Sequence, residues 1–252
     1  MDTIGIIGGS GLDNPDILKD ARDVTVGTPY GPLTSPLKVG TIGGCKVVLL
    51  ARHGREHTDS PTRVANRANV WALNEQGCQC ILATTAVGSL REEIDRGHLV
   101  ILDQFIDFTR RRELTFHEVF APHQPVHTPM AEPFSAPLRE RLIKACKKQG
   151  IPFHEKGTVV TIEGPRFSTR AESNMFRAWG ADVINMSTAP ECILANELGI
   201  PYAAVAMSTD YDCWKVDEAP VTWDEILKTF NENVGKVTRV LLDAVAGLAA
   251  GE

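Results

Sequence analysis

The segment DVINMSTAPECILANELGIPYAAVAM, residues 182–207, predicts the fold class. Asp182 to Met186 is a short apolar run with strand character, and Pro201 to Met207 is a second one. Between them, Thr188 and Glu191 form a capping box that predicts the start of a helix, and Gly199 predicts its end. A strand, a helix and a strand in succession are typical of an α/β fold.

The same alternation extends along the rest of the chain. Further runs with strand character are Thr3 to Ile7, Cys45 to Ala51, Cys80 to Thr84, Leu99 to Leu102 and Val159 to Ile162. Helices are predicted at 62–76, at 138–149, from the capping box Thr169/Glu172 to Gly180, and from the capping box Thr222/Glu225 to about Ala246. Residues 36–42 and 45–51 flank Gly43-Gly44 and predict a hairpin. We therefore expect one α/β domain, residues 1–252, with a central mixed sheet flanked by helices.

The composition narrows the class of protein. The chain has 252 residues, of which 43% are hydrophobic and 23% charged, with a formal net charge of −6. This charge argues against a dedicated nucleic-acid binder. The start lacks the pattern of a signal peptide, and no apolar run approaches the roughly 18 residues of a membrane span. We expect a cytoplasmic protein with no nucleic-acid or membrane partner.

The six cysteines are scattered, and Cys78 and Cys80 are the only close pair. No second pair with zinc-finger spacing accompanies them. Buried reduced thiols are the favoured interpretation, because free cysteine packs as a small hydrophobe. A metal site or a disulfide is the alternative.

Glycines and polar residues gather where predicted strands end, and ligands of α/β sheets sit beyond the carboxyl ends of strands. Gly8-Gly9-Ser10-Gly11 follows the first strand, but it lacks the third glycine of a dinucleotide fingerprint and the lysine of a P-loop. Arg52 and His53 follow another strand, and an arginine offers a fixed fork to an anion. The stretch ATTAVGSL, residues 83–90, adds hydroxyls and backbone N–H groups. Together these loops predict a site for free inorganic phosphate, although each alone is compatible with a structural turn.

Histidine spacing gives little support to a metal site. His53 and His57 are four residues apart, but no glutamate follows His53 and Gly54 argues against a helix. His117, His123 and His127 lie in a proline-bearing polar stretch, where exposed loop histidines are favoured. We expect no metal.

Asp210 and Asp212 follow a predicted buried strand in AMSTDYDCW, residues 206–214. In an extended backbone they share a face and repel each other unless a metal, a proton or a ligand with two donors lies between them. Phe167 and Met186, next to the hydroxyls of Ser168 and Ser187, are compatible with a purine and ribose pocket or with ordinary core.

Seven segments, IGIIGGSGLD, LLARHGREHT, ATTAVGSLREEI, DQFIDFT, VTIEGPRFSTRAES, ADVINMSTAPE and AMSTDYDCW, resemble the trimeric purine nucleoside phosphorylase family. Within that family they are most similar to the enzymes that act on methylthioadenosine, from about Thr3 to the final helix. The resemblance implies cleavage of the N-glycosidic bond by phosphate, giving adenine and 5-methylthioribose-1-phosphate. It implies a homotrimer whose sites are shared between subunits, and no cofactor besides the co-substrate phosphate.

The resemblance also implies residue roles. Phosphate would be held by Ser10, Arg52, His53, Thr85, the Ala86 backbone and Ser187. Phe167, Ser168 and Met186 would line the base and sugar pocket, Asp210 and Asp212 would face the adenine, and His127 would reach a neighbouring subunit's site. Trp223, Ile226 and Leu227 are the apolar candidates for the methylthio group.

A departing purine needs a proton at N7, and a free aspartic acid, with a pKa of about 3.9, is too acidic to supply it. Burial and a like-charged neighbour both raise a carboxyl pKa, so we expect Asp210 to be the acid and Asp212 to accept the 6-amino group. The alternatives are a purine nucleoside phosphorylase of broader 5' specificity, a hydrolytic nucleosidase and a non-catalytic nucleotide-binding protein.

Overall fold

Two long parallel strands, β5 (Ile81–Ser89) and β11 (Tyr202–Tyr211), run side by side through the molecule. Their register pairs Ile81 with Tyr202 and Ser89 with Tyr211, and it shifts by a bulge between Ser208 and Asp210. Every residue of β11 is buried. Continuous burial is typical of a strand that is covered on both faces of its sheet.

The computed structural model describes residues 1–9, 16–217 and 222–251, without the side chains of residues 223–225. The other strands are β1 (Thr3–Gly8), β2 (Lys19–Val24), β3 (Leu37–Ile42), β4 (Cys45–Ala51), β6 (Leu99–Ile101), β7 (Gln104–Phe108), β8 (Phe153–His154), β9 (Thr158–Ile162) and β10 (Val183–Asn185). The α-helices are α1 (Asn66–Glu75), α2 (Ala136–Gln149), α3 (Arg170–Ala178), α4 (Thr188–Glu197) and α5 (Trp223–Ala250).

The described strands form one mixed sheet in the order β2-β3-β4-β1-β5-β10-β9-β7, with β11 paired to β5 and β6, and β8 paired to β6. On one edge, β5 pairs with β1 as far as Ala83 and with β10 only from Gly88 onward. Among the described strands, none pairs with residues 84–87 on that edge. This gap in the ladder leaves the middle of β5 without a strand partner on that edge, although Thr84 and Thr85 are only 1% and 5% exposed.

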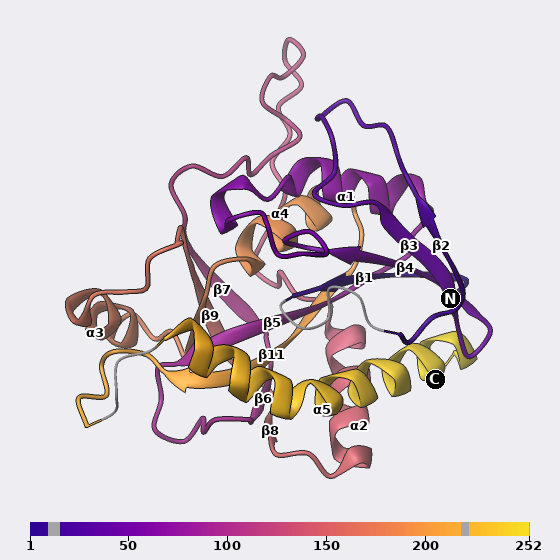
Figure 1. The fold of residues 1–252 in the computed structure, drawn as a ribbon. Coiled ribbons are helices and arrows are strands. Elements are labelled where there is room, and N and C mark those ends of the chain that lie inside the picture. Colours follow the sequence, from indigo (N-terminus) through magenta and orange to yellow (C-terminus); the bar gives the residue numbers. More distant parts are fainter. Residues whose placement is uncertain (10–15, 218–221, 252) are drawn as a thin grey trace.

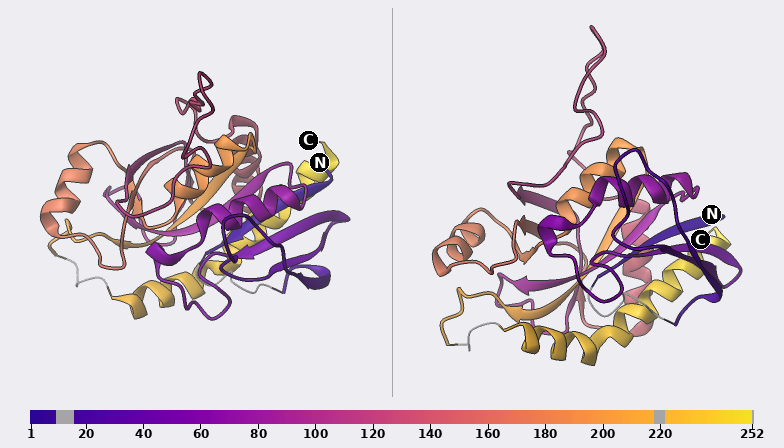
Figure 2. Two further views of the ribbon diagram at one scale, coloured as in Figure 1. Left: turned by 90° about the horizontal axis from the view of Figure 1, so that it is seen from above. Right: turned by 45° about the horizontal axis from the view of Figure 1, so that its top comes forward.

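Helices cover both faces of the sheet (Figure 1). On one face, α1 and α4 bury Leu73 and Leu194 in a core that includes Ile81. On the other face, α2 and α5 bury Leu142 and Leu241. The two termini lie close together, as Figure 2 also shows, and the Met1 amino group donates a 3.1 Å hydrogen bond to the Leu248 carbonyl.

The predicted class, one α/β domain with a mixed sheet flanked by helices, is confirmed. The β3–β4 hairpin is present, with Ile42 opposite Cys45. The capping box at α3 is also confirmed, since the Glu172 N–H donates to the Thr169 hydroxyl at 3.2 Å and the Thr169 N–H donates to the Glu172 carboxylate at 2.8 Å.

Several predicted boundaries were wrong. The helix expected from Thr62 begins at Asn66, after a 3-10 turn at Pro61–Arg63, because Val64 has an extended ψ of 123°. The strands expected to end at Thr84 and Met207 continue to Ser89 and Tyr211, and α5 continues to Ala250.

Three strands were not anticipated: β2, β7 and β8. The edge strand β2, for example, is exposed along most of its length and has no apolar alternation. The capping box predicted with Glu225 lies outside the described residues, because the side chain of Glu225 is not described.

The cysteines are free thiols, as predicted, and Cys45, Cys78, Cys80, Cys146 and Cys192 are buried. Burial raises the pKa of both Cys78 and Cys80 to about 12. None of the described helices has the length and apolar composition that crossing a bilayer requires.

Candidate active site

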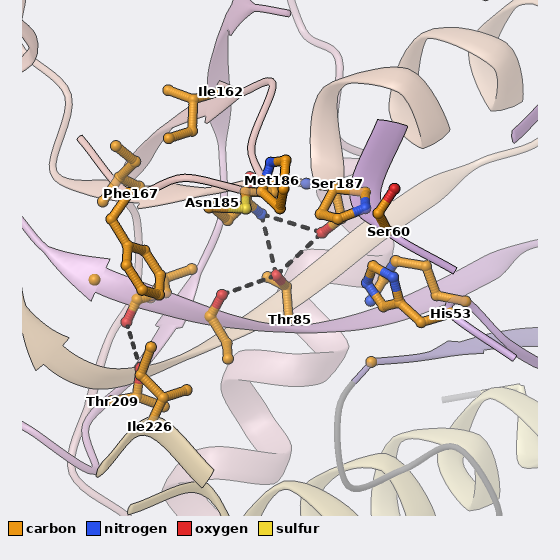
Figure 3. A pocket seen from close by; sticks show the side chains of 18 of the residues that line it. His53, Ser60, Thr85, Ile162, Phe167, Asn185, Met186, Ser187, Thr209 and Ile226 are labelled. Carbon is orange, nitrogen blue, oxygen red and sulfur yellow. Dashed lines mark hydrogen bonds between the residues drawn. The ribbon is translucent and has the colours of Figure 1, made fainter. Parts of the chain in front are cut away.

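A pocket of about 510 Å³ opens beside the gap in the β5 ladder. This volume lies within the range of small-molecule sites. Its wall is formed by the carboxyl ends of β4, β5, β9, β10 and β11, the loops that follow them, and the start of α5. In Figure 3, His53 and Ser60 lie at one side of the pocket, and Phe167, Thr209 and Ile226 lie at the other.

Hydroxyls converge near the middle of the pocket. Thr85 Oγ1 lies 3.2 Å from Ser187 Oγ, and Asn185 Nδ2 donates to Thr85 Oγ1 at 3.1 Å (Figure 3). Asn185 is held in turn by the Thr161 hydroxyl, which donates to its Oδ1 at 2.8 Å. Thr85 therefore has a fixed orientation within β5 itself, not in a loop after the strand as the sequence suggested.

The helix α4 begins at this hydroxyl cluster. Ser187 is its N-cap residue and Thr188 its first residue. The positive end of the helix dipole favours an anion here, but the Ala189 N–H already donates to the Thr161 hydroxyl at 3.1 Å and Pro190 has no N–H. The predicted capping box at Thr188 and Glu191 is wrong: Ser187 makes no side-chain cap, and the Thr188 hydroxyl accepts from Asn185 Nδ2 at 2.6 Å instead.

Arg52 lines the pocket, but its charge is compensated. Its Nε and Nη2 donate to the two carboxylate oxygens of Glu191, and its Nη1 donates to the Thr84 carbonyl at 2.9 Å. The two side chains of this ion pair are 2% and 3% exposed. The guanidinium thus makes the hydrogen bond to the Thr84 carbonyl that a neighbouring strand would otherwise make, inside the gap in the β5 ladder.

His53 lines the pocket next to Arg52, with its Nδ1 2.9 Å from the Asp59 carbonyl. Its ring stacks on His57, with a centroid distance of 4.5 Å. In the part of the chain that the structure describes, no group of three or more His, Cys, Asp and Glu residues could hold a metal ion.

Asp210 and Asp212 both lie next to Gly88 at the other end of the pocket. A Cβ on Gly88 would lie 3.1 Å from Asp210 Oδ2 and 3.5 Å from Asp212 Cβ. The Thr209 hydroxyl donates to Asp210 Oδ1 at 2.7 Å, and the Asp212 N–H donates to the Ser89 carbonyl at 3.0 Å. The bulge and the ladder bond together bring both carboxyls to the pocket wall.

Burial raises the pKa of Asp212 above its ordinary value. The hydroxyls of Ser173 and Ser168 and the Cys213 N–H oppose this rise, and the charge of Glu172 adds to it. Neither serine forms a well-aligned hydrogen bond, and Asp212 Oδ2 has no hydrogen-bond partner. The like charge that raises this pKa comes from Glu172, a contribution that the sequence did not suggest.

Most of the other predicted site residues also line the pocket. They are Ala86, Phe167, Ser168, Met186, Ser187 and Ile226. Leu227 does not line it, and His127 is exposed in the segment between β7 and α2. Part of this segment projects away from the body (Figure 1). Ser10 and the side chain of Trp223 lie outside the described residues, although Gly9, directly before Ser10, lines the pocket.

The site also includes Asn185, Glu191, Thr209 and Gly88, none of which was predicted as a site residue. Asn185 carried a signal, since it is a polar residue at the end of an apolar strand that precedes Ser187. The position of Glu191, three residues after Thr188, matches a capping box, so the sequence pattern predicted a helix cap and not a partner for Arg52.

Comparison with known proteins gives the family. The model of the phosphorylase superfamily matches residues 3–246. This chain belongs to the phosphorylase superfamily. Within the superfamily, it is 57% identical to S-methyl-5'-thioadenosine phosphorylase of Xenopus tropicalis over 250 residues, which are 98% of this chain and 89% of the relative.

Solved structures of superfamily members have the same fold. Methylthioadenosine phosphorylase of Schistosoma mansoni in complex with adenine has a TM-score of 0.95 and 42% identity, covering 99% of this chain and 93% of that one. A variant of the Schistosoma adenosine/methylthioadenosine phosphorylase in complex with methylthioadenosine has a TM-score of 0.91 and 41% identity, with the same coverage.

The raised pKa of Asp212 predicts a pH-dependent cost to stability. A carboxyl whose pKa is higher in the folded than in the unfolded state stabilises the fold below about pH 4, and this contribution is lost as pH rises through the folded pKa. Asp212→Asn cannot ionise. We expect its melting temperature to exceed that of the wild type by an amount that grows from pH 4 to pH 8, as measured by circular dichroism.

The exposed substitution Asp2→Asn serves as the control and should show no such trend. A difference between Asp212→Asn and wild type that is constant across this pH range would contradict the assignment of burial as the main cause.

Proposed function

We propose that the protein catalyses phosphorolysis of S-methyl-5'-thioadenosine, giving adenine and 5-methylthioribose-1-phosphate. The observation that carries the proposal is one pocket with two different ends. Hydroxyls and an arginine lie at one end, beside the start of α4, and two carboxyls lie at the other. The 57% identity to a phosphorylase of this name supports the choice of substrate.

Phosphate binds at the hydroxyl end in this proposal. Thr85, Ser187, Arg52, His53 and the Ala86 N–H contact it, together with Ser10 as the sequence suggests. The C1'–N9 bond breaks as positive charge develops on the ribosyl ring, and a phosphate oxygen then bonds to C1'. The fixed dianion stabilises this charge before it becomes the nucleophile.

Adenine binds at the carboxyl end. Asp210 donates a proton to N7, so that the base leaves neutral, and Asp212 accepts a hydrogen bond from the 6-amino group. Burial raises the pKa of Asp212, so this end of the pocket favours a protonated carboxyl more than water does. Phe167, Ser168 and Met186 line the base and sugar pocket, and Ile226, with Trp223 and Leu227, is the candidate contact for the methylthio group.

The second candidate is a phosphorylase that also accepts adenosine. The relative from Schistosoma mansoni, 41% identical, is named an adenosine/methylthioadenosine phosphorylase, which favours this possibility. A hydrolytic nucleosidase has less support, because a reaction with water does not require the phosphate site at the hydroxyl end of the pocket. A non-catalytic nucleotide-binding protein has less support still, because carboxyls and an anion site converge in one pocket.

The proposal includes a homotrimer that works in the cytoplasm, in purine and methionine salvage, without a metal or an organic cofactor. The exposed loop around His127 supports the trimer. Val119, Phe120 and Val126 on this loop are 89%, 42% and 44% exposed, and a neighbouring subunit would cover them. In such an assembly His127 reaches the neighbour's site.

Base release with and without phosphate tests the reaction. We expect adenine to form from methylthioadenosine only when phosphate is present. Methylthioinosine should react at least about 100-fold more slowly. Its 6-oxo group is a hydrogen-bond acceptor, and it would face the Asp212 carboxylate, which is also an acceptor. Release is followed by chromatography of the free base. Equal release without phosphate would contradict phosphorolysis, and equal rates on the two nucleosides would contradict the role of the carboxyl pair.

Substitution of the acid tests the assigned roles. Asp210→Asn should lower kcat/KM for methylthioadenosine by about 10²- to 10⁴-fold, the typical contribution of a general acid. Phosphate affinity, measured by calorimetry, should stay at the wild-type value because the anion end is intact. The control Asp243→Asn removes a carboxylate that pairs with Lys148 outside the pocket and should retain wild-type turnover. Wild-type turnover of Asp210→Asn would remove Asp210 from this role.

Gly88 is the close contact at the carboxyl end. In Gly88→Ala the new Cβ would lie 3.1 Å from both Asp210 Oδ2 and Ile184 Cγ2, so these side chains must shift. We expect kcat/KM for the nucleoside to fall by about 10- to 100-fold, because small displacements of reacting groups are costly. The phosphate KM should stay within twofold of wild type. Gly27→Ala is the control, since no heavy atom lies within 4 Å of its Cβ. An equal fall of kcat/KM in both variants would contradict the importance of the close contact between Gly88 and Asp210.

A further inference from the structure

Two buried polar side chains behind Arg52 have no part in the reaction described above. Glu191 lies on α4 and Tyr202 is the first residue of β11. Tyr202 donates its hydroxyl to Glu191 Oε2 at 2.8 Å, and the same carboxylate accepts both hydrogen bonds from the Nε and Nη2 of Arg52. Arg52, Glu191 and Tyr202 are all buried.

This arrangement fixes the plane of the guanidinium from two sides. Glu191 holds one edge, and the Thr84 carbonyl holds Nη1 at 2.9 Å. Thr84 directly precedes Thr85, and Glu191 lies one helical turn after Ser187. The strand and the helix that carry the two pocket hydroxyls thus also hold Arg52.

A contribution to stability does not explain the ion pair. Withdrawing two charges from water is costly, and apolar residues of similar volume often give an equal or more stable protein. The Tyr202 hydroxyl is suited to donating, because burial and the charge of Glu191 raise its pKa well above the ordinary value. The site therefore uses three buried polar groups to orient one guanidinium at the pocket wall.

We propose that Glu191, supported by Tyr202, is a positioning residue for the phosphate co-substrate, acting through the orientation of Arg52. The inference rests on the proposed phosphorolysis, in which Arg52 contacts phosphate. Loss of the carboxylate fork lets the guanidinium rotate away from the orientation that meets the anion. The effect falls on phosphate and not on the nucleoside, because the carboxyl end of the pocket is unchanged.

The test uses Glu191→Gln, in which an amide NH₂ replaces one of the two acceptors. We expect the KM for phosphate to rise at least tenfold, while the KM for methylthioadenosine at saturating phosphate stays within twofold. Tyr202→Phe removes only the hydroxyl and should raise the phosphate KM two- to fivefold. Titration of the free enzyme with inorganic phosphate by calorimetry should show the same order of affinities.

Glu197→Gln is the matched control. It makes the same substitution on the same helix, but its carboxylate binds the Thr115 hydroxyl and the Phe116 N–H, both at 2.7 Å, away from the pocket. Its phosphate KM should equal that of the wild type.

The outcomes separate this inference from the proposed function. Adenine release by the wild type without phosphate would overturn the proposed function and this inference with it. If the wild type requires phosphate, an unchanged phosphate KM in both Glu191→Gln and Tyr202→Phe would overturn the positioning role alone. An equal rise of both KM values would also overturn it, because that is the signature of a general structural defect.

Discussion

The parallel register of β5 and β11 is the constraint on which the site depends. It places Thr85 opposite Ala206 and Gly88 opposite Asp210, with a bulge that brings Asp210 to the pocket. Thr85 and Gly88 are about 10 Å apart along the strand, and this spacing sets the distance between the hydroxyl end and the carboxyl end of the pocket. The pocket exists because β1 leaves β5 at Ala83 and β10 joins it only at Gly88.

The two ends of the pocket differ in their charged and polar groups: one carries hydrogen-bond donors and the other carries carboxyls. At the hydroxyl end, a buried carboxylate compensates Arg52, and the hydroxyls of Thr85 and Ser187 supply further donors. At the other end, Asp212 is buried with an oxygen that has no hydrogen-bond partner. Such a group costs stability, and a buried carboxyl with a raised pKa is typical of functional sites.

Much of this organisation could be predicted from the sequence. The alternation of apolar runs and helix signals gave the α/β class, and clusters at predicted strand ends led to Arg52, Thr85, Ser187, Asp210 and Asp212, which all line the pocket. The strands were predicted too short, because Thr85 and Asp210 are polar and were read as ends. In the structure they stay in buried strands, since Asn185 and Thr209 satisfy them.

The remaining features depend on contacts between distant segments. Glu191 matches a helix cap in its local pattern, but a buried guanidinium 139 residues away in sequence is its partner. The gap in the β5 ladder follows from where β1 and β10 begin and end, which no local pattern reports. The place of His127 in the proposed trimer is set by a second copy of the chain, so neither the sequence nor one subunit can define it.

In the proposed reaction, phosphate bound at one end of this pocket is the nucleophile that displaces adenine bound at the other. The most direct measurement is ³¹P NMR of a reaction with ¹⁸O-labelled phosphate and methylthioadenosine. We expect one sugar-1-phosphate for each adenine released, with the label in the oxygen that bridges phosphorus and C1'. Adenine that accumulates with free methylthioribose, while the phosphate signal stays unchanged, would contradict it.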